Sequence, residues 1–399
     1  MYTGVRILLI RSNPSSPRLL PIMNRLLLAC ALLLSSTRLF AQTPIPTPPA
    51  VDARAYILVD SHTDKILASK DAVARMEPAS LTKLMTTYIV FQELAQGKLR
   101  LDEQVTVSEH AWRSEGSRTF IELGKPVPVN ILIMGMIVQS GNDATIALAE
   151  RIAGTEETFV QMMNSNAKRL GMVGTHFENS SGLPSPQHYT TARDMSLLAN
   201  AIIREYPQYY RWYSVREFQY NGIKQQNRNG LLTKDSSVDG MKTGHTDSAG
   251  FCLVTSALRD GMRLVSVVLG SASMKAREDA SAALLNYGFT FYDTKLLTKG
   301  GVKLGEANLW KAASTPVDVG TGHDVWMTVP RGESAGIKTV VEIQPRLIAP
   351  VSPATTIGQL RILNGAGQTI GSESLHPLKA VELGGWWRRL IDSIRLWFN

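Results

Sequence analysis

The sequence predicts an α/β (α+β) protein: an antiparallel sheet flanked by helices, then a small all-β domain and a C-terminal amphipathic helix. Hairpin patterns at 55–69 and 249–270 place paired strands on either side of a helix-rich segment. From about residue 295 helical periodicity disappears, and Gly, Thr, Val and Pro dominate. Apolar residues then recur every three to four positions across 386–398.

Length and composition indicate a globular chain of more than one domain. The chain has 399 residues, of which 44% are hydrophobic and 19% charged. We place the first domain at 52–294, the β-rich domain at 295–381 and the terminal helix at 382–399.

The N-terminus has the pattern of a secretory signal peptide. Residues 1–41 contain five Arg and no Asp or Glu, and a basic start at Arg25 precedes the apolar run 26–34. This run is shorter than the roughly 20 residues that span a bilayer. We expect residues 1–41 to be removed, with 1–22 an upstream extension before Met23; a lipoprotein box at "LLAC" is the alternative. The segment 42–51 is a Pro-rich spacer.

The elements of the first domain follow from local patterns. "AYILVD–SHTD–KILAS" reads as strand, turn and strand, and "RDG" joins the two apolar strands of 249–270. Apolar residues at helical spacing, closed by caps or glycines, predict the helices. These helices lie at 78–96, 130–153, 155–170, 191–206 and 276–292. In the β-rich domain, "DVWMTVP", "TVVEIQP" and "GQLRILN" read as short strands.

Charge and cysteine content argue against a nucleic-acid-binding protein and against a protein stabilised by intrachain disulfides. Five of the eight net positive charges lie in residues 1–41, so the basic character is no footprint of nucleic-acid binding. Beyond residue 41 the chain keeps one cysteine, Cys252, which excludes an intrachain disulfide there. Its apolar neighbours, "FCLVTSAL", predict a small buried core residue.

The last stretch, 384–399, predicts attachment to a membrane surface. Three Trp, with Leu, Ile and Phe, form one helical stripe, and Arg388, Arg389, Asp392 and Arg395 fall mainly on the other side. The helix is too short and too charged to span a bilayer, but it suits the interface. The alternative is a helix docked on the β domain.

The chemistry of the chain begins with Ser80 and Lys83 in "PASLTKLMTT". Residues three apart share a helix face, with Cβ atoms about 5–6 Å apart. A serine hydroxyl needs a base, and a lysine can serve when burial and nearby cations lower its pKa. Ser165 and Lys168 have the same spacing, but they lie near the end of a predicted helix beside Arg169. We expect those two to be solvated surface residues.

Two further motifs favour Ser80 as the nucleophile. "QSGNDA" supplies Ser140 and Asn142, and "GMKTGHT" supplies Lys242, Thr243 and Gly244. S-x-x-K, S-x-N and K-T-G occur together, in this order, in penicillin-binding proteins and class A β-lactamases.

The chain resembles the low-molecular-mass penicillin-binding proteins of the serine D-alanyl-D-alanine carboxypeptidase type. The resemblance includes "PASLTKLMT", "QSGNDA", "ARDM", "NRNGLL", "VDGMKTGHTD" and "KARED". It also includes the β domain and the terminal helix, which free class A β-lactamases lack. It implies a serine penicillin-recognising, transpeptidase-like domain with the three motifs around one cleft.

The resemblance, together with the chemistry, assigns roles to ten residues. Ser80 attacks the bond between two D-alanines, Lys83 takes its proton and Ser140 relays a proton to the leaving amine. Substrate binding falls to Asn142, Lys242, Thr243, Gly244, His245, Arg228 and Arg277. The backbone N–H groups of Ser80 and His245 form the oxyanion hole. For Arg228 and Arg277, an ordinary structural ion pair is the alternative.

We expect a D,D-carboxypeptidase acting on peptidoglycan pentapeptides, acylated by β-lactams and held at the periplasmic face of the bacterial inner membrane. The alternatives are a D,D-endopeptidase, a β-lactamase and a non-catalytic wall-binding protein. The histidines form no H-x-x-x-H or H-x-H pair, so a zinc peptidase is disfavoured. We expect no metal and no cofactor.

Overall fold

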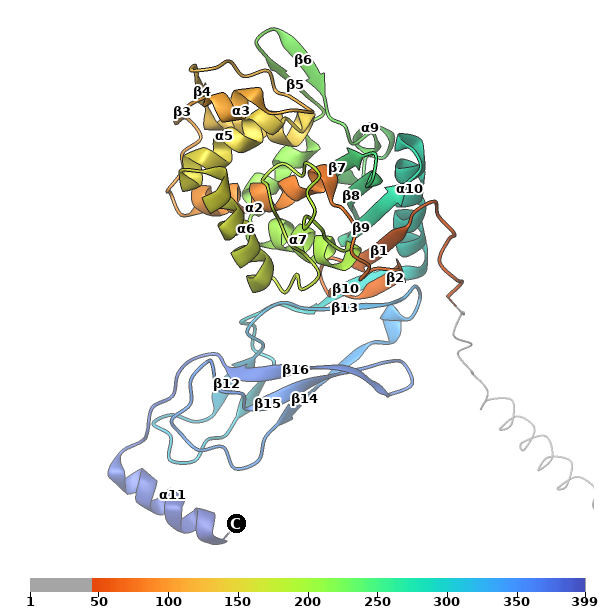
Figure 1. Ribbon diagram of the computed structural model, residues 1–399. Helices are drawn as coiled ribbons and strands as arrows, with labels where there is room; N and C mark the ends of the chain where they lie inside the picture. The colour runs from red at the N-terminus through yellow and green to blue at the C-terminus, as the bar shows by residue number, and fades with distance from the viewer. Residues whose placement is uncertain (1–44, 399) are drawn as a thin grey trace, which may run out of the picture. The chain divides into compact units, whose positions relative to one another are not determined.

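The computed structural model describes residues 45–398, so the predicted signal peptide, residues 1–41, lies outside the described part. A five-stranded sheet forms the centre of the first domain, in the order β2-β1-β9-β8-β7, with every pair antiparallel (Figure 1). Its strands are β1 (Ala55–Asp60), β2 (Ile66–Lys70), β7 (Val238–Thr246), β8 (Gly250–Arg259) and β9 (Met262–Ser271). Both predicted hairpins are confirmed, and K-T-G lies on the edge strand β7.

Helices cover both faces of this sheet. Alternate residues of β1 point to opposite sides, so Ile57 and Val59 join the main core while Leu58 faces the other way. There Gly288 of α10 (Met274–Phe291) packs against Leu58 and Leu264, where a larger side chain would collide with both. On the main-core side lie α2 (Lys83–Ala95) and α7 (Ala192–Glu205), as Figure 1 shows. Helices α2, α7 and α10 correspond to those predicted at 78–96, 191–206 and 276–292.

The predicted helix 130–153 is wrong as a single element. The chain forms α4 (Val129–Met134), a π-helical turn (Gly135–Gln139) and then, after a break, α5 (Asn142–Ala153). Ser140 adopts φ +66° at the break. Gly135 and Gly141 both press against the side chain of Thr119, where a Cβ atom would come within about 2 Å of its hydroxyl. Ser140 therefore lies between two helical segments and belongs to neither.

Smaller elements complete the first domain. Ser80 lies in a 3₁₀ turn, η1 (Ala79–Thr82), that leads directly into α2, and α2 ends before Gly97 as predicted. The hydroxyl of Thr191 caps α7 by accepting from the N–H of Asp194. The remaining elements are β3 (Gln104–Thr106), α3 (Glu109–Arg113), β4 (Pro126–Pro128), α6 (Glu156–Arg169), α8 (Pro207–Tyr210), η3 (Arg211–Ser214), β5 (Glu217–Tyr220), β6 (Ile223–Gln226) and α9 (Leu231–Lys234).

The C-terminal region is built from strands around a core of its own. Apolar side chains such as Val319, Leu360 and Leu375 form this second core. The strands are β10 (Tyr292–Thr298), β11 (Gly305–Ala307), β12 (Val317–Gly320), β13 (Val325–Pro330), β14 (Lys338–Ile343), β15 (Gly358–Leu363) and β16 (Thr369–Pro377), with the 3₁₀ turn η4 (Ser334–Gly336). All three strand motifs predicted in this region are confirmed.

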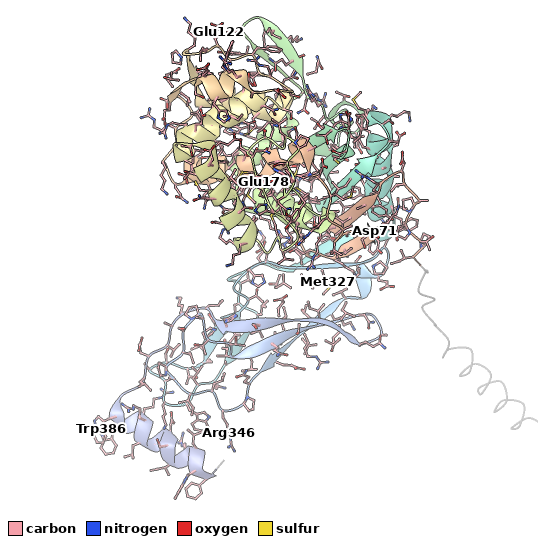
Figure 2. The ribbon with its side chains drawn as sticks, in the orientation of Figure 1. Asp71, Glu122, Glu178, Met327, Arg346 and Trp386 are labelled. Carbon is pink, nitrogen blue, oxygen red and sulfur yellow. The ribbon has the colours of Figure 1, made fainter. Side chains whose placement is uncertain are left out.

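The chain ends in helix α11 (Trp386–Phe398), whose first residue, Trp386, is labelled in Figure 2. Asp392 is buried and accepts a hydrogen bond from the backbone N–H of Lys311, 2.6 Å away. The apolar side chains of the helix are exposed; Trp397, for example, is 90% exposed. Among the described residues, no helix is long and apolar enough to cross a membrane.

Candidate active site

Ser80 is presented by a strained turn between the sheet edge and α2. The residue before it, Ala79, has φ +47°, a conformation that L-residues rarely adopt. Gly182, at φ +87°, packs against the carbonyl of Ala79, where a Cβ atom would lie 1.9 Å from the oxygen. The loop that carries Gly182 therefore packs directly against the turn that carries Ser80.

Lys83 is fully buried, and its amine points at Ser80. The Nζ atom lies 3.2 Å from Ser80 Oγ and donates to Asn142 Oδ1 and the carbonyl of Ser181, both at 2.6 Å. A neutral amine has two N–H groups and one lone pair. Because the two acceptors take both N–H groups, the lone pair is left for the hydroxyl of Ser80.

The surroundings make the neutral form of Lys83 accessible. Burial, and after it the nearby positive charge of Arg228, lower the pKa of Lys83 to about 7, even though Asp143 and Glu156 act in the opposite sense. Near pH 7 a substantial fraction of this lysine is therefore unprotonated. Such a group can accept a proton from a serine hydroxyl.

Ser140 and Lys242 form a second buried pair. Lys242 Nζ donates to Ser140 Oγ at 2.9 Å and to the carbonyl of Thr243 at 3.1 Å. Burial holds the pKa of Lys242 well below its usual value, and the positive charges of Lys83, Arg228 and Arg277 contribute. Ser140 thus accepts from a lysine that is able to lose and regain its proton.

Asn142 and Asp143 hold the wall of the cleft. Asn142 Nδ2 donates to the carbonyl of Glu115 at 2.6 Å, which fixes the amide with its oxygen toward Lys83. The buried carboxylate of Asp143 accepts from the backbone N–H groups of three consecutive residues, Thr119, Phe120 and Ile121.

A cleft of about 520 Å³ opens in front of these groups. It is lined by Ser80, Gly116, Ser117, Ser140, Arg228, Thr243, Gly244, His245, Phe251, Met274 and Arg277. The other predicted residues, Lys83, Asn142 and Lys242, lie behind the lining and are hydrogen-bonded to it or to one another. The structure thus brings all ten predicted site residues together.

Positive charge collects on the sheet side of the cleft. Arg277 donates to the carbonyls of Gly244 and Cys252, at 3.2 and 3.4 Å, and burial lowers the pKa of both Arg228 and Arg277. Neither arginine belongs to an ion pair among residues 45–398, so the alternative of a structural ion pair finds no support there. Two unpaired guanidinium groups suit a carboxylate.

Comparison with known proteins identifies the family. The family model for D-alanyl-D-alanine carboxypeptidase matches residues 42–273, and that for the penicillin-binding protein 5 C-terminal domain matches 291–383. The D-alanyl-D-alanine carboxypeptidase DacA of Escherichia coli is 40% identical over 366 residues, 90% of this chain and 91% of the relative. The chain belongs to the D-alanyl-D-alanine carboxypeptidase family.

Solved structures of the family agree with the fold. Penicillin-binding protein 5 from Haemophilus influenzae matches with a TM-score of 0.80 at 39% identity, covering 84% of this chain and 99% of that chain. Penicillin-binding protein D2 from Listeria monocytogenes, in its ampicillin-bound form, has a TM-score of 0.57 at 30% identity and covers 61% and 100%. The predicted fold class and the predicted enzyme class, a serine-type D-Ala-D-Ala carboxypeptidase, are confirmed.

The site of this carboxypeptidase also uses residues that the sequence analysis missed. The carbonyl of Ser181 accepts from Lys83, and the preceding residue, Ser180, is held on two sides. Glu156 accepts from its N–H and its hydroxyl, at 2.8 and 2.6 Å, while the hydroxyl of Thr86 donates to its carbonyl at 2.7 Å. The cluster of turn residues in "ENSSGL" was the one available signal.

The remaining expectations concern residues outside the catalytic cleft. Ser165 and Lys168 are exposed on α6, as predicted. Cys252 is buried, and burial raises the pKa of its thiol, in agreement with a core role. Within residues 45–398 no cluster of three or more His, Cys, Asp or Glu is placed to hold a metal ion.

Proposed function

We propose that this carboxypeptidase removes the terminal D-alanine of peptidoglycan pentapeptides through an acyl-enzyme on Ser80. The observation that carries the proposal is the position of a buried lysine of lowered pKa 3.2 Å from the hydroxyl of Ser80. A buried lysine beside a serine, with both N–H groups occupied, supplies the base that the hydroxyl lacks.

In the first half of the reaction, Lys83 takes the hydroxyl proton as Ser80 Oγ attacks the carbonyl of the penultimate D-alanine. The backbone N–H groups of Ser80 and His245 receive the oxyanion. Ser140 then passes a proton to the departing amine, and Lys242, 2.9 Å from Ser140 Oγ, replaces it. D-alanine leaves, and the ester on Ser80 remains.

In the second half, a water molecule replaces the amine. Lys83 first gives up the proton that it took from Ser80, and Lys242 regains the proton that it supplied through Ser140, so both lysines return to their starting states. Lys83 then takes a proton from the water, the hydroxide attacks the ester, and the proton passes from Lys83 to Ser80 Oγ when the ester bond breaks. An amine acceptor would compete with water at the same step, and a cross-linked peptide would make the reaction an endopeptidase cleavage. The β-lactam amide resembles the D-Ala-D-Ala amide, so penicillins would acylate Ser80 in the same way.

The cations of the cleft would bind the substrate carboxylate. Arg228 and Arg277 line the cleft beside Thr243, whose hydroxyl is placed to donate to a carboxylate oxygen. Because Lys242 lies next to Thr243, the C-terminal end of the peptide is drawn to this part of β7. The free edge of β7 then pairs with the peptide backbone.

The location that suits this substrate is the periplasmic face of the inner membrane. The predicted leader would export the chain, and the exposed apolar side of α11 would rest in the membrane interface. That arrangement holds the enzyme close to newly made peptidoglycan.

Release of D-alanine from diacetyl-L-lysyl-D-Ala-D-Ala, with labelling by fluorescent penicillin, tests the proposal. Ser80→Ala should lose both signals. Ser165→Ala, which changes the serine of the identically spaced but exposed pair, should keep both. Labelling that persists in Ser80→Ala would refute the nucleophile, and labelling without release by the unmodified protein would favour the endopeptidase or a wall-binding protein.

A further inference from the structure

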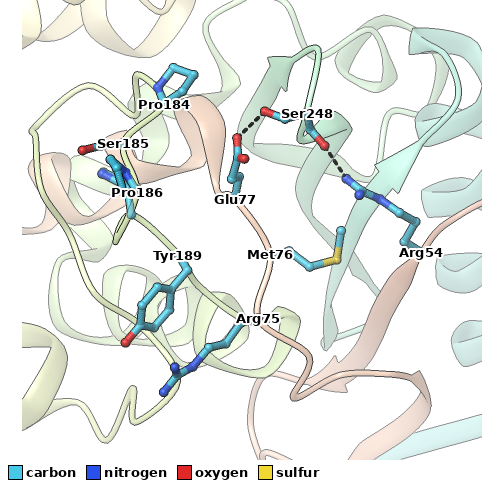
Figure 3. A pocket seen from close by; sticks show the side chains of 10 residues that line it. Arg54, Arg75, Met76, Glu77, Pro184, Ser185, Pro186, Tyr189 and Ser248 are labelled. Carbon is cyan, nitrogen blue, oxygen red and sulfur yellow. Dashed lines mark hydrogen bonds between the residues drawn. The ribbon is translucent and has the colours of Figure 1, made fainter.

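A second concavity, of about 590 Å³, lies outside the catalytic cleft (Figure 3). One wall is the segment Arg75–Glu77, the second is the loop 184–189, and the third is formed by Ser248 and Arg54. The rim carries guanidinium groups, one carboxylate and the ring of Tyr189. No role in the reaction described above falls on any of these side chains.

Each wall of this concavity is close in sequence to a segment of the catalytic site or contacts one directly. Glu77 precedes Ser80 by three residues, and Ser248 follows the end of β7 by two. His188, in the second wall, is buried and hydrogen-bonds Thr82 with 2.8 Å between Nε2 and Oγ1. The concavity therefore lies beside the nucleophile turn.

The order of contacts along β7 shows the direction in which the concavity lies. Lys242 contacts Ser140, Gly244 packs against the carbonyl of Pro78, and Thr246 lies 3.5 Å from the carboxylate of Glu77. Following the strand from Lys242, a paired peptide would pass the nucleophile and then reach Glu77 and Ser248. A strand advances about 3.3 Å per residue, so the two residues from Gly244 to the end of β7 at Thr246 span about 7 Å, and Ser248 lies in the turn that follows.

The substrate direction follows from the proposed function, on which this inference rests. If the C-terminal carboxylate lies by Lys242 and Thr243, with the scissile bond at Ser80, the preceding residues run toward Thr246. Peptide residues about two to four positions upstream then arrive at the second concavity. That part of the peptide carries the charged side chains.

The concavity offers charges of both signs that do not neutralise each other. Within residues 45–398, Arg54, Arg75 and Glu77 take part in no ion pair. The guanidinium carbon of Arg75 lies 4.3 Å from the centre of the Tyr189 ring, and the side chain is otherwise exposed. Figure 3 shows Glu77 accepting from the hydroxyl of Ser248, which orients the carboxylate.

We infer that this concavity is a subsite for the charged residues that precede the D-Ala-D-Ala terminus of the substrate peptide. Arg75, whose guanidinium group lies over the ring of Tyr189, binds a carboxylate of the peptide, and Glu77 binds an ammonium group. The site thus selects peptides with an acidic residue and a diamino residue upstream of the scissile bond. A peptide with neutral, acylated upstream groups uses only the catalytic cleft.

The test compares two substrates in one protein. The neutral substrate is diacetyl-L-lysyl-D-Ala-D-Ala, and the charged substrate is acetyl-D-γ-glutamyl-L-lysyl-D-Ala-D-Ala, which carries a carboxylate and a free amine. Arg75→Gln should lower the ratio of kcat/KM, charged over neutral, by about threefold to fivefold, the size expected for one exposed ion pair. Glu77→Gln should lower the ratio again when the lysine amine is free, but not when it is acetylated.

Arg113→Gln is the matched control, since Arg113 is an exposed arginine paired only with Glu109 on α3. It should leave the ratio unchanged. A ratio that is the same in Arg75→Gln and the unmodified protein would overturn the subsite.

Calorimetric binding of the charged peptide separates this inference from the proposed function. In the Ser80→Ala background, Arg75→Gln should weaken that binding by a similar factor even though no turnover occurs. Weakened binding in the absence of any turnover by the unmodified protein would support the subsite and contradict the proposed function. Equal binding with and without Arg75 would reject the subsite alone.

Discussion

At the scale of one residue, the burial of Lys83 lowers the stability of the fold but provides the neutral amine that catalysis needs. In the unfolded chain its pKa has the ordinary value of 10.5, and in the fold burial lowers it to about 7. Between these two pH values the unfolded state binds the proton more tightly, so protonation favours unfolding. The destabilisation of the fold caused by burying this lysine therefore decreases as pH rises from about 7 to 10.5. At neutral pH the protein tolerates that cost and gains a base.

The acid limb of the pH–rate profile should report this lysine. Since Lys83 must be neutral to accept a proton, kcat/KM should rise with pH through about 7. Arg228→Gln removes a positive charge that lowers the pKa of Lys83, so the limb should move to higher pH. Glu156→Gln removes a negative charge that raises this pKa, so the limb should move to lower pH. Profiles for diacetyl-L-lysyl-D-Ala-D-Ala measure both shifts.

The two variants should shift the acid limb in opposite directions, so each variant serves as a control for the other. Arg228 also belongs to the proposed carboxylate site, so its loss should reduce the height of the profile as well. Glu156 does not face the substrate, and a glutamine there can still accept a hydrogen bond from Ser180. Shifts of the same sign in both variants, or no shift in either, would contradict the assignment of Lys83 as the base.

At the scale of elements, the loop 178–183 positions the turn that carries Ser80 and the amine of Lys83. Asn179 Oδ1 accepts from the N–H groups of Ser181, Gly182 and Leu183, which folds the loop tightly. The loop then presents the carbonyl of Ser181 to Lys83 and places Gly182 against Ala79. It therefore touches Lys83 and the residue before Ser80, and both contacts are made by its backbone.

Gly182→Ala should uncouple this loop from the nucleophile turn. The position has φ +87°, and the new Cβ atom would lie 1.9 Å from the carbonyl oxygen of Ala79, so the turn or the loop must move. We expect penicillin acylation to slow by more than about tenfold and unfolding to become easier by about 1–3 kcal/mol. The acylation rate and thermal melting measure the two effects.

Gly222→Ala provides the comparison for backbone strain alone. Gly222 lies in the β5–β6 turn at φ +72°, with no atom within 4 Å of a new Cβ atom. Its substitution should cost stability, roughly 1 kcal/mol, but leave acylation unchanged. If both variants acylated at the normal rate, the loop would have no role in positioning the nucleophile.

Sequence patterns predicted most elements, and the ten residues proposed for the site lie together in the structure. The patterns gave no information on what backbone atoms do. The apolar spacing of 130–153 continues through 135–141, so nothing in periodicity predicts that Ser140 leaves the helix with φ +66°. Similarly, Ser181 acts through its carbonyl, a group that every residue carries. Residue type records side-chain chemistry, and therefore the contribution of the loop 178–183 was visible only in three dimensions.

At the scale of the whole molecule, α11 contacts the β domain through a polar residue, Asp392. Asp392 is buried against the N–H of Lys311, while Trp386, Ile394 and Trp397 face away and are exposed. A helix that completed the core of the β domain would show the reverse pattern. The exposed apolar stripe thus favours a contact with something outside the chain.

Vesicle sedimentation should identify that contact as a lipid surface. For a chain that begins at Gln42, Ile394→Asp puts a charge on the apolar stripe, so binding to neutral phosphatidylcholine vesicles should be lost. Arg388→Gln changes the net charge by the same amount on the polar side. It should keep binding to neutral vesicles and weaken only the added attraction of anionic lipid, by about 1 kcal/mol. Deletion of 384–399 should abolish both. Binding that survives the deletion would mean that the lipid contact lies elsewhere in the chain and not on the apolar stripe of α11.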